Sequence, residues 1–167
     1  ECTETGDTGV KTSYKYSADY STLPYTDMCK PEYFARGVPV ETVTYEKRDG
    51  IFTESGKVRY NHVFNPGRAD MLRLSSVQES VAGGSLTTRE SYTYSDDGNL
   101  VGVKSDNTLQ RSFLWSYNHT CPVAVIDGAS YEEVSSWAGS QLVATLAAAK
   151  GPADGLLTQI RSALQDK

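Results

Sequence analysis

The stretch that decides the fold is residues 90–126, ESYTYSDDGNLVGVKSDNTLQRSFLWSYNHTCPVAVI. Its apolar and aromatic residues alternate with polar ones, which is the period of a half-buried β-strand. Two clusters, Asp96-Asp97-Gly98-Asn99 and Asp106-Asn107, interrupt the alternation with residues that favour tight turns. Because the connections are short, consecutive strands should pair as antiparallel neighbours in a meander. The predicted strands cover residues 86–94, 100–104, 111–117 and 123–126.

The segments upstream of residue 90 look like looser copies of this pattern. Residues 1–9 are polar and predict a frayed end. Slips in the alternation at Gly56 and at Ser75-Ser76 predict bulges, and Phe52, Val58, Tyr60 and His62 are expected to share one face. A short helix within residues 25–35 is limited by Pro31, and residues 68–70 read as a loop after the Asn65-Pro66-Gly67 turn. Strands are predicted over 10–16, 40–47, 51–64 and 71–81, with turns at Asp49-Gly50 and Gly83-Gly84.

After Asp127-Gly128 the apolar period changes from 2 to 3.6. Ser130 is suited to cap a helix over 131–138, a second helix follows over about 140–150, and Pro152 opens a third. The predicted fold class is therefore α+β, mainly β. An antiparallel β-meander over residues 1–128 is followed by a C-terminal helical hairpin over 129–167, within one structural domain.

Composition excludes several functional classes. The formal net charge is −5 and the basic residues are scattered, which argues against a nucleic-acid binder. No apolar run reaches the length of a membrane span. The chain opens ECTETGD with neither an initiator Met nor a signal peptide, and this favours a piece of a larger protein. Three cysteines without CxxC spacing indicate no zinc site. A Cys2–Cys29 bridge and free thiols both stay open.

The segment YTYSDDGNLVGV, residues 92–103, resembles the YD (RHS) repeat, in which a Tyr-x-Tyr strand runs into a D-x-x-G-N turn and an apolar strand. The segment SFLWSYNHTCPVAVIDGASYEEV is similar to one found in large RHS-like proteins of Bacteroidetes bacteria. The resemblance covers roughly residues 10–165 and is strongest over 91–134. It implies a secreted or surface-exposed protein with a structural, encapsulating or adhesive role, and it supplies no catalytic residues. Only one repeat is near consensus, and no hypervariable toxin segment follows.

Four groups of residues invite a sharper interpretation. Asp96, Asp97 and Asn99 could offer oxygens to calcium, but the EF-hand spacing is absent and a hairpin turn explains them. His119 and Cys121 could form a nucleophile pair, but the simpler reading is a Cys on a loop. The sequon Asn118-His119-Thr120 is idle in a bacterial setting. The last group could stack on a sugar, although cross-strand packing is the simpler explanation. This candidate ligand-binding set is Tyr92, Tyr94, Trp115 and Tyr117.

The sequence thus predicts a non-catalytic structural or interaction module that needs no cofactor or metal. Its partners would be neighbouring repeats of the parent chain, and a surface glycan or protein. Two alternatives are open: a carbohydrate- or protein-binding adhesin element that uses exposed aromatics, and a carrier-shell segment of a polymorphic toxin. The apolar stripes of the C-terminal helices could recruit a partner helix or cover the sheet.

Overall fold

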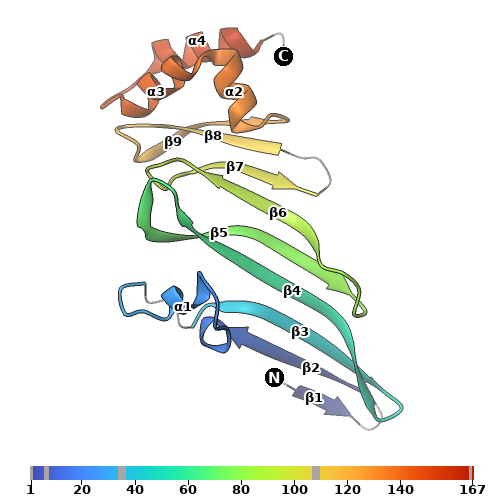
Figure 1. Ribbon diagram of the computed structural model, residues 1–167. Helices are drawn as coiled ribbons and strands as arrows, with labels where there is room; N and C mark the ends of the chain where they lie inside the picture. The colour runs from blue at the N-terminus through green and yellow to red at the C-terminus, as the bar shows by residue number, and fades with distance from the viewer. Residues whose placement is uncertain (1, 6–7, 34–36, 107–109, 166) are drawn as a thin grey trace. The chain divides into compact units, whose positions relative to one another are not determined.

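The computed structural model describes residues 2–5, 8–33, 37–106, 110–165 and 167, with only the backbone described for 2–5. The chain divides into two compact units, Glu1–Ser91 and Tyr92–Lys167. The last strand ends at Asp127 and the C-terminal helices begin at Tyr131, so the change from strands to helices lies inside the second unit. The predicted class, a mainly β α+β fold with an antiparallel meander and C-terminal helices, is confirmed (Figure 1).

The first unit is an antiparallel sheet in which each strand pairs with the strand before it (Figure 1). The predicted frayed start is wrong, because β1 and the first residues of β2 pair with each other. The predicted loop at 68–70 is also strand, since the Pro66-Gly67 turn brings Arg68 directly opposite Asn65. The strands are β1 Cys2–Thr5, β2 Thr8–Tyr16, β3 Pro39–Arg48, β4 Ile51–Asn65, β5 Arg68–Val81 and β6 Thr87–Tyr94, of which β6 runs on into the second unit.

Tight turns and bulges set the register of these strands. Asp49 and Gly50 have φ values of 51° and 80°, as the mirror-image hairpin turn between β3 and β4 requires. The pairing skips Ser55 in β4 and Ser75 in β5, so bulges occur where the sequence indicated them. One predicted face is wrong. Because the Ser55 bulge reverses the alternation, Phe52 pairs with Lys47 and leaves the face of Val58, Tyr60 and His62.

The register gives the sheet of the first unit two chemically different faces, since residues paired across strands share a face. We call the first the aromatic face; it carries Tyr14, Thr42, Val58, Tyr60, His62, Leu74 and Val77. We call the second the charged face; it carries Lys15, Glu41, Lys57, Arg59, Asn61, Ser76 and Gln78.

A small hydrophobic cluster lies where β3 begins. Met28 and Val40 are fully buried there, with Tyr20, Tyr25, Tyr33 and Leu72 packed against them. Helix α1 spans only Tyr25–Met28 and follows the 3-10 turn η1, Ser17–Asp19. It is shorter than the interval 25–35 allowed, as Pro31 indicated, and residues 34–36 lie outside the described part of the chain.

In its described residues, the second unit contains the end of β6, the antiparallel strands β7, β8 and β9, and three helices. Helix α2 starts as predicted: Ser130 Oγ accepts a hydrogen bond from Glu133 N at 3.2 Å, and Ser130 N donates to the Glu133 carboxylate at 2.8 Å. The elements are β7 Leu100–Ser105, β8 Gln110–Ser116, β9 Cys121–Asp127, α2 Tyr131–Ala138, α3 Ser140–Ala148 and α4 Asp154–Leu164.

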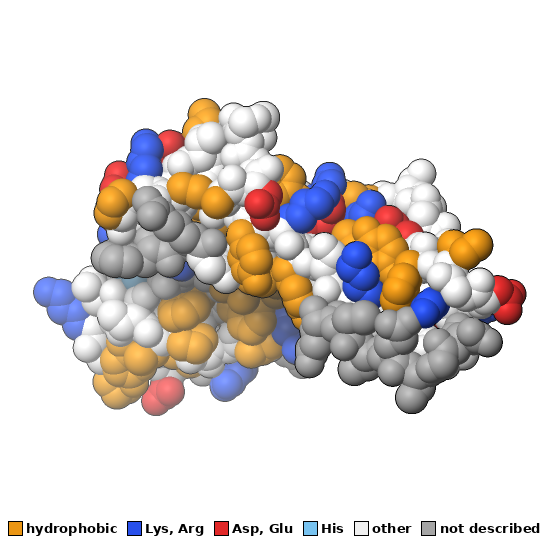
Figure 2. Space-filling view, turned by 90° about the horizontal axis from the view of Figure 1, so that it is seen from below, with side chains coloured by type: hydrophobic (Ala, Val, Ile, Leu, Met, Phe, Trp, Pro, Cys, Tyr) orange, Lys and Arg blue, Asp and Glu red, His pale blue; other side chains and the backbone are white. Residues whose placement is uncertain are grey.

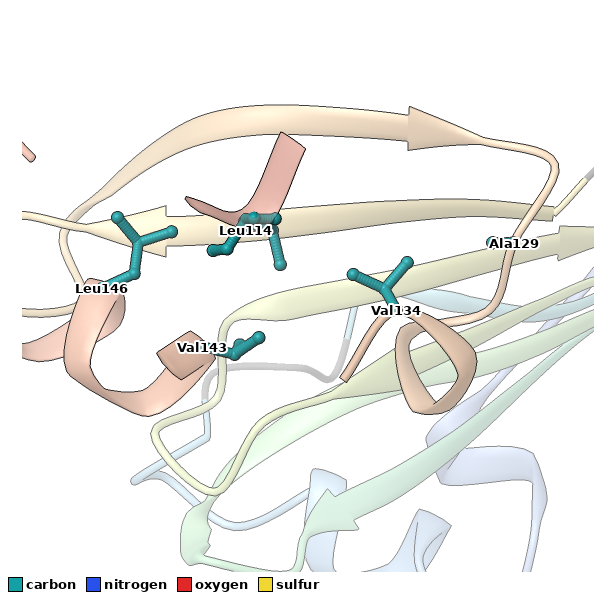
Figure 3. Close-up of a cluster of buried hydrophobic side chains, with 6 residues drawn as sticks. Leu114, Ala129, Val134, Val143 and Leu146 are labelled. Carbon is teal, nitrogen blue, oxygen red and sulfur yellow. The ribbon is translucent and has the colours of Figure 1, made fainter. Parts of the chain in front are cut away.

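The core of the second unit forms between β8 and the helices. Figure 3 shows Leu114 of β8 with Val134 of α2 and with Val143 and Leu146 of α3 gathered around it. Ile160 of α4 belongs to the same cluster. The apolar stripes of the helices therefore cover β8 and one another, which is the simpler of the two interpretations that the sequence allowed.

Candidate functional site

The strongest candidate site is an open groove of about 380 Å³ on the aromatic face of the first unit. Strands β2, β3, β4 and β5 each contribute to its lining, and Val38 precedes β3 at its rim. Pockets that hold small ligands have volumes of roughly 300–1,000 Å³, so the groove is large enough for one. The lining residues are Tyr14, Val38, Pro39, Thr42, Tyr60, His62 and Leu74.

The groove carries polar groups but no group that is charged at neutral pH. Tyr14, Thr42 and Tyr60 supply hydroxyls, and His62 supplies an imidazole. Burial lowers the pKa of His62 below its ordinary value of 6.5, and a hydrogen bond with the Tyr60 backbone raises it by a smaller amount. Among the residues that the structure describes, His62 Nδ1 is buried without a hydrogen-bond partner. The groove thus combines aromatic and aliphatic walls with neutral hydrogen-bonding groups.

The charged face holds a buried carboxylate between two cations. Glu41 is only 1% exposed, and its Oε1 accepts a hydrogen bond from Lys15 Nζ at 2.7 Å. Its Oε2 accepts from Arg59 Nη2 at 2.6 Å and from Arg59 Nε at 3.1 Å. Burial by itself raises the pKa of Glu41, but the hydrogen bonds and positive charges of Lys15 and Arg59 outweigh it and lower the pKa. This cluster joins β2, β3 and β4 through side-chain hydrogen bonds to the Glu41 carboxylate.

Amide and hydroxyl groups continue the charged face across β4 and β5. Asn61 Nδ2 donates to Ser76 Oγ and to Gln78 Oε1, each at 3.0 Å. Gln78 Nε2 in turn donates to Thr88 Oγ1 at 3.5 Å. These polar groups satisfy one another, so this face offers a ligand fewer unoccupied donors than its composition suggests.

The second unit contains a smaller cavity, of about 190 Å³, beside the turn of residues 95–99. Trp115 lines it, and the indole Nε1 donates to Leu100 O at 2.8 Å. His119 Nδ1 lies 2.9 Å from Asp97 Oδ2, and Asn99 Nδ2 donates to His119 O at 2.6 Å. The polar groups around this cavity are therefore largely used to join the turn to the segment after β8.

That segment is a run of three residues with positive φ: Tyr117, Asn118 and His119, at 53°, 54° and 64°. Such a run is unusual because the left-handed conformation is unfavourable for residues with a side chain. Here the backbone N–H groups of Asn118 and His119 donate to Ala149 O and Ala147 O, at 2.8 and 2.9 Å. They thereby pair with carbonyls at the end of α3 that the helix leaves unbonded.

The sequence-predicted ligand-binding residues have separate roles. Tyr92 and Tyr94 are half-buried on β6. Trp115 lines the small cavity, and Tyr117 lies beyond the end of β8 in the left-handed turn, so it does not continue the strand face of Phe113 and Trp115. The sequence did not indicate the residues of the groove as a ligand-binding site. Their alternation was visible, but the pairing of four strands was needed to bring them together.

The other motifs have structural explanations. Gly98, with φ 86°, donates its N–H to Ser95 O, as expected of a turn. Within the described ranges, no group of three or more His, Cys, Asp or Glu side chains could hold a metal ion. His119 faces Asp97, and the Cys121 thiol lies beside the Thr120 hydroxyl. Cys29 Sγ lies 3.5 Å from Ser17 Oγ, while the side chain of Cys2 is outside the described residues.

No family model, curated protein or solved structure matches this chain. In the part of the chain that the structure describes, no helix combines the length and apolar character needed to cross a membrane.

Proposed function

We propose that this chain is a non-catalytic structural and interaction module of a larger, secreted or cell-surface RHS/YD-repeat protein. Neighbouring repeats of the parent chain would be its first partners, and a surface ligand its second. The YD-like sequence of residues 92–103 suggests the family. The observation that carries the proposed role is the single-layered sheet of the first unit.

Little of the apolar surface of that sheet is covered within the first unit, which favours a partner that covers it. Among the described residues of the first unit, the buried hydrophobic side chains are Met28, Val40 and Val43. Large apolar side chains such as Tyr14, Val38 and Val63 remain exposed, and Figure 2 shows hydrophobic patches at the surface between Lys and Arg side chains. An exposed apolar surface of this kind is typical of interaction sites.

The outer edge of β9 also supports an interaction role. Within the described residues, β9 pairs with β8 on one side only. The helices that follow β9 pack on side chains of both β8 and β9, and no strand pairs with the outer edge of β9 in the described part of the chain. An edge strand of this kind can pair with a further strand. In a meander of repeats, the next repeat would supply that strand.

Hydrogen exchange tests this structural role. Backbone amides of β9 should exchange faster in the isolated chain than in the parent protein with its flanking segments. Amides of β8, which have strand partners on both sides, should exchange at similar rates in both. Equal exchange of β9 in the isolated and the parent chain would count against the proposal.

A second candidate is a carbohydrate- or protein-binding adhesin element. The groove on the aromatic face favours it, because its lining mixes aromatic rings with neutral hydrogen-bonding groups. The predicted set around Trp115 supports it less, since the indole N–H already has a backbone partner.

A further inference from the structure

We infer that the groove on the aromatic face binds a neutral sugar ring of a glycan, an inference that rests on the proposed interaction role. Strand register decides the position of its main groups. Tyr14 pairs with Thr42 across β2 and β3, and Leu74 pairs with His62 across β5 and β4. Tyr60 lies two residues before His62 and therefore on the same face. Two tyrosines are thus held by paired strands, with a hydroxyl and an imidazole beside them.

The charge of the groove selects a neutral ligand. Of the cations on β2, β3 and β4, Lys15, Lys57 and Arg59 belong to the charged face. Arg48 lies on the aromatic face, but it is paired with Glu46 at 2.9 Å and does not line the groove. Glu46 and Glu79 share the aromatic face with the groove but do not line it. An anionic ligand would find no cation in the lining, and a cationic ligand would find no carboxylate there.

The polar groups of the groove favour a sugar over an apolar protein segment. The hydroxyl-bearing residues Tyr14, Thr42 and Tyr60 line the groove, and within the described residues the buried His62 Nδ1 has no hydrogen-bond partner. An aliphatic side chain that filled the groove would remove these groups from water without replacing their hydrogen bonds, which is unfavourable. A sugar ring presents C–H groups to the aromatic walls and hydroxyls to the polar groups, and so meets both requirements.

In the first experiment, the full chain is applied to a glycan array that carries neutral, sialylated and sulfated glycans. Calorimetric titration with the neutral oligosaccharide that binds most tightly then measures the affinity. We expect saturable binding to neutral glycans. Val38→Asp places a carboxylate at the groove rim and should weaken binding at least tenfold. Val63→Asp is the matched control, because Val63 has a similar exposure, 43% against 39%, but pairs with Arg73 on the opposite face. It should leave the affinity within twofold.

A second pair of variants separates stacking from hydrogen bonding. Tyr14→Phe keeps the ring and should bind more tightly than Tyr14→Ser, which removes it. Circular dichroism and thermal midpoints establish that each variant is folded. The inference is overturned if the folded chain binds no neutral glycan or binds only acidic ones. It is also overturned if the chain self-associates in sedimentation and Val38→Asp abolishes that association, because the groove would then be an interface between copies.

Failure of this inference can be told apart from failure of the proposed structural role. The comparison of the chain with Val38→Asp reports on the groove in the first unit, whereas the exchange of β9 amides in the parent chain reports on the pairing of β9 with a further strand. Protected β9 amides without glycan binding would overturn the sugar site alone.

Discussion

The buried carboxylate of Glu41 offers the sharpest test of how the first unit is held together. We consider Glu41→Gln, which keeps the size of the side chain and one acceptor oxygen but removes the charge. In the folded protein the two oxygens of the Glu41 carboxylate accept hydrogen bonds from Lys15 and Arg59, which lie on the two neighbouring strands. The substitution therefore leaves two cations without their shared anion.

The size of the effect follows from exposure. Removing one partner of a fully buried ion pair costs about 3–5 kcal/mol. Here Glu41 is 1% exposed, but the side chains of Lys15 and Arg59 are 52% and 37% exposed, so water can solvate both cations after the change. Hydrogen bonds to charged groups contribute roughly 1.5–3 kcal/mol each, and exposed pairs contribute less. We expect Glu41→Gln to lower the free energy of unfolding of the first unit by about 2–3 kcal/mol.

Urea denaturation at pH 7 measures this difference. The matched control is Glu46→Gln on the same strand, because Glu46 pairs with Arg48 at the surface, at 2.9 Å. That change should cost no more than about 0.5 kcal/mol. The lowered pKa of Glu41 adds a pH test: its stabilisation is present above its ordinary pKa of 4.5 and is lost as the pH falls through the lowered value. A cost below 1 kcal/mol, or equal costs for the two variants, would refute the reasoning.

Three further predictions concern a cavity, two glycines and His62. Leu146→Ala empties the fully buried centre of the second unit and should cost about 2–5 kcal/mol in urea denaturation, with local loss of hydrogen-exchange protection in α3. Gly98→Ala should destabilise by about 1–2 kcal/mol because its φ of 86° is left-handed, whereas Gly155→Ala, inside α4 with open space around it, should stabilise by up to about 1 kcal/mol. The pKa of His62 is lowered in the folded state, so the unfolding free energy should fall as the pH drops below 6.5 towards that lowered value. His62→Asn should remove this part of the pH dependence, and an unchanged or stronger dependence of the unfolding free energy on pH in the variant would contradict the prediction.

Local chemistry in the sequence was enough for the order of the strands and for most turns. Alternating residues and turn residues such as Asp49-Gly50 act over a few positions, and short connections leave antiparallel neighbours as the simplest pairing. The Ser130 cap and the change of period at residue 128 likewise predicted the helices. The errors at residues 1–9 and 68–70 have a different origin. Both segments are mainly polar, and residues 2–5, 8, 9 and 68–70 form strands because a partner strand pairs with their backbone, which composition does not reveal.

Only the tertiary structure decided which side chains meet. The bulge at Ser55 moved Phe52 to the face opposite Tyr60, since one unpaired residue reverses every later side chain in a strand. The groove required Tyr14, Thr42, His62 and Leu74 from four strands, and the Glu41 cluster required partners 26 and 18 residues away. The sequence by itself determined a meander with a helical end, because that depends on local patterns. The faces, the groove and the buried charge depend on register, which is a property of paired strands.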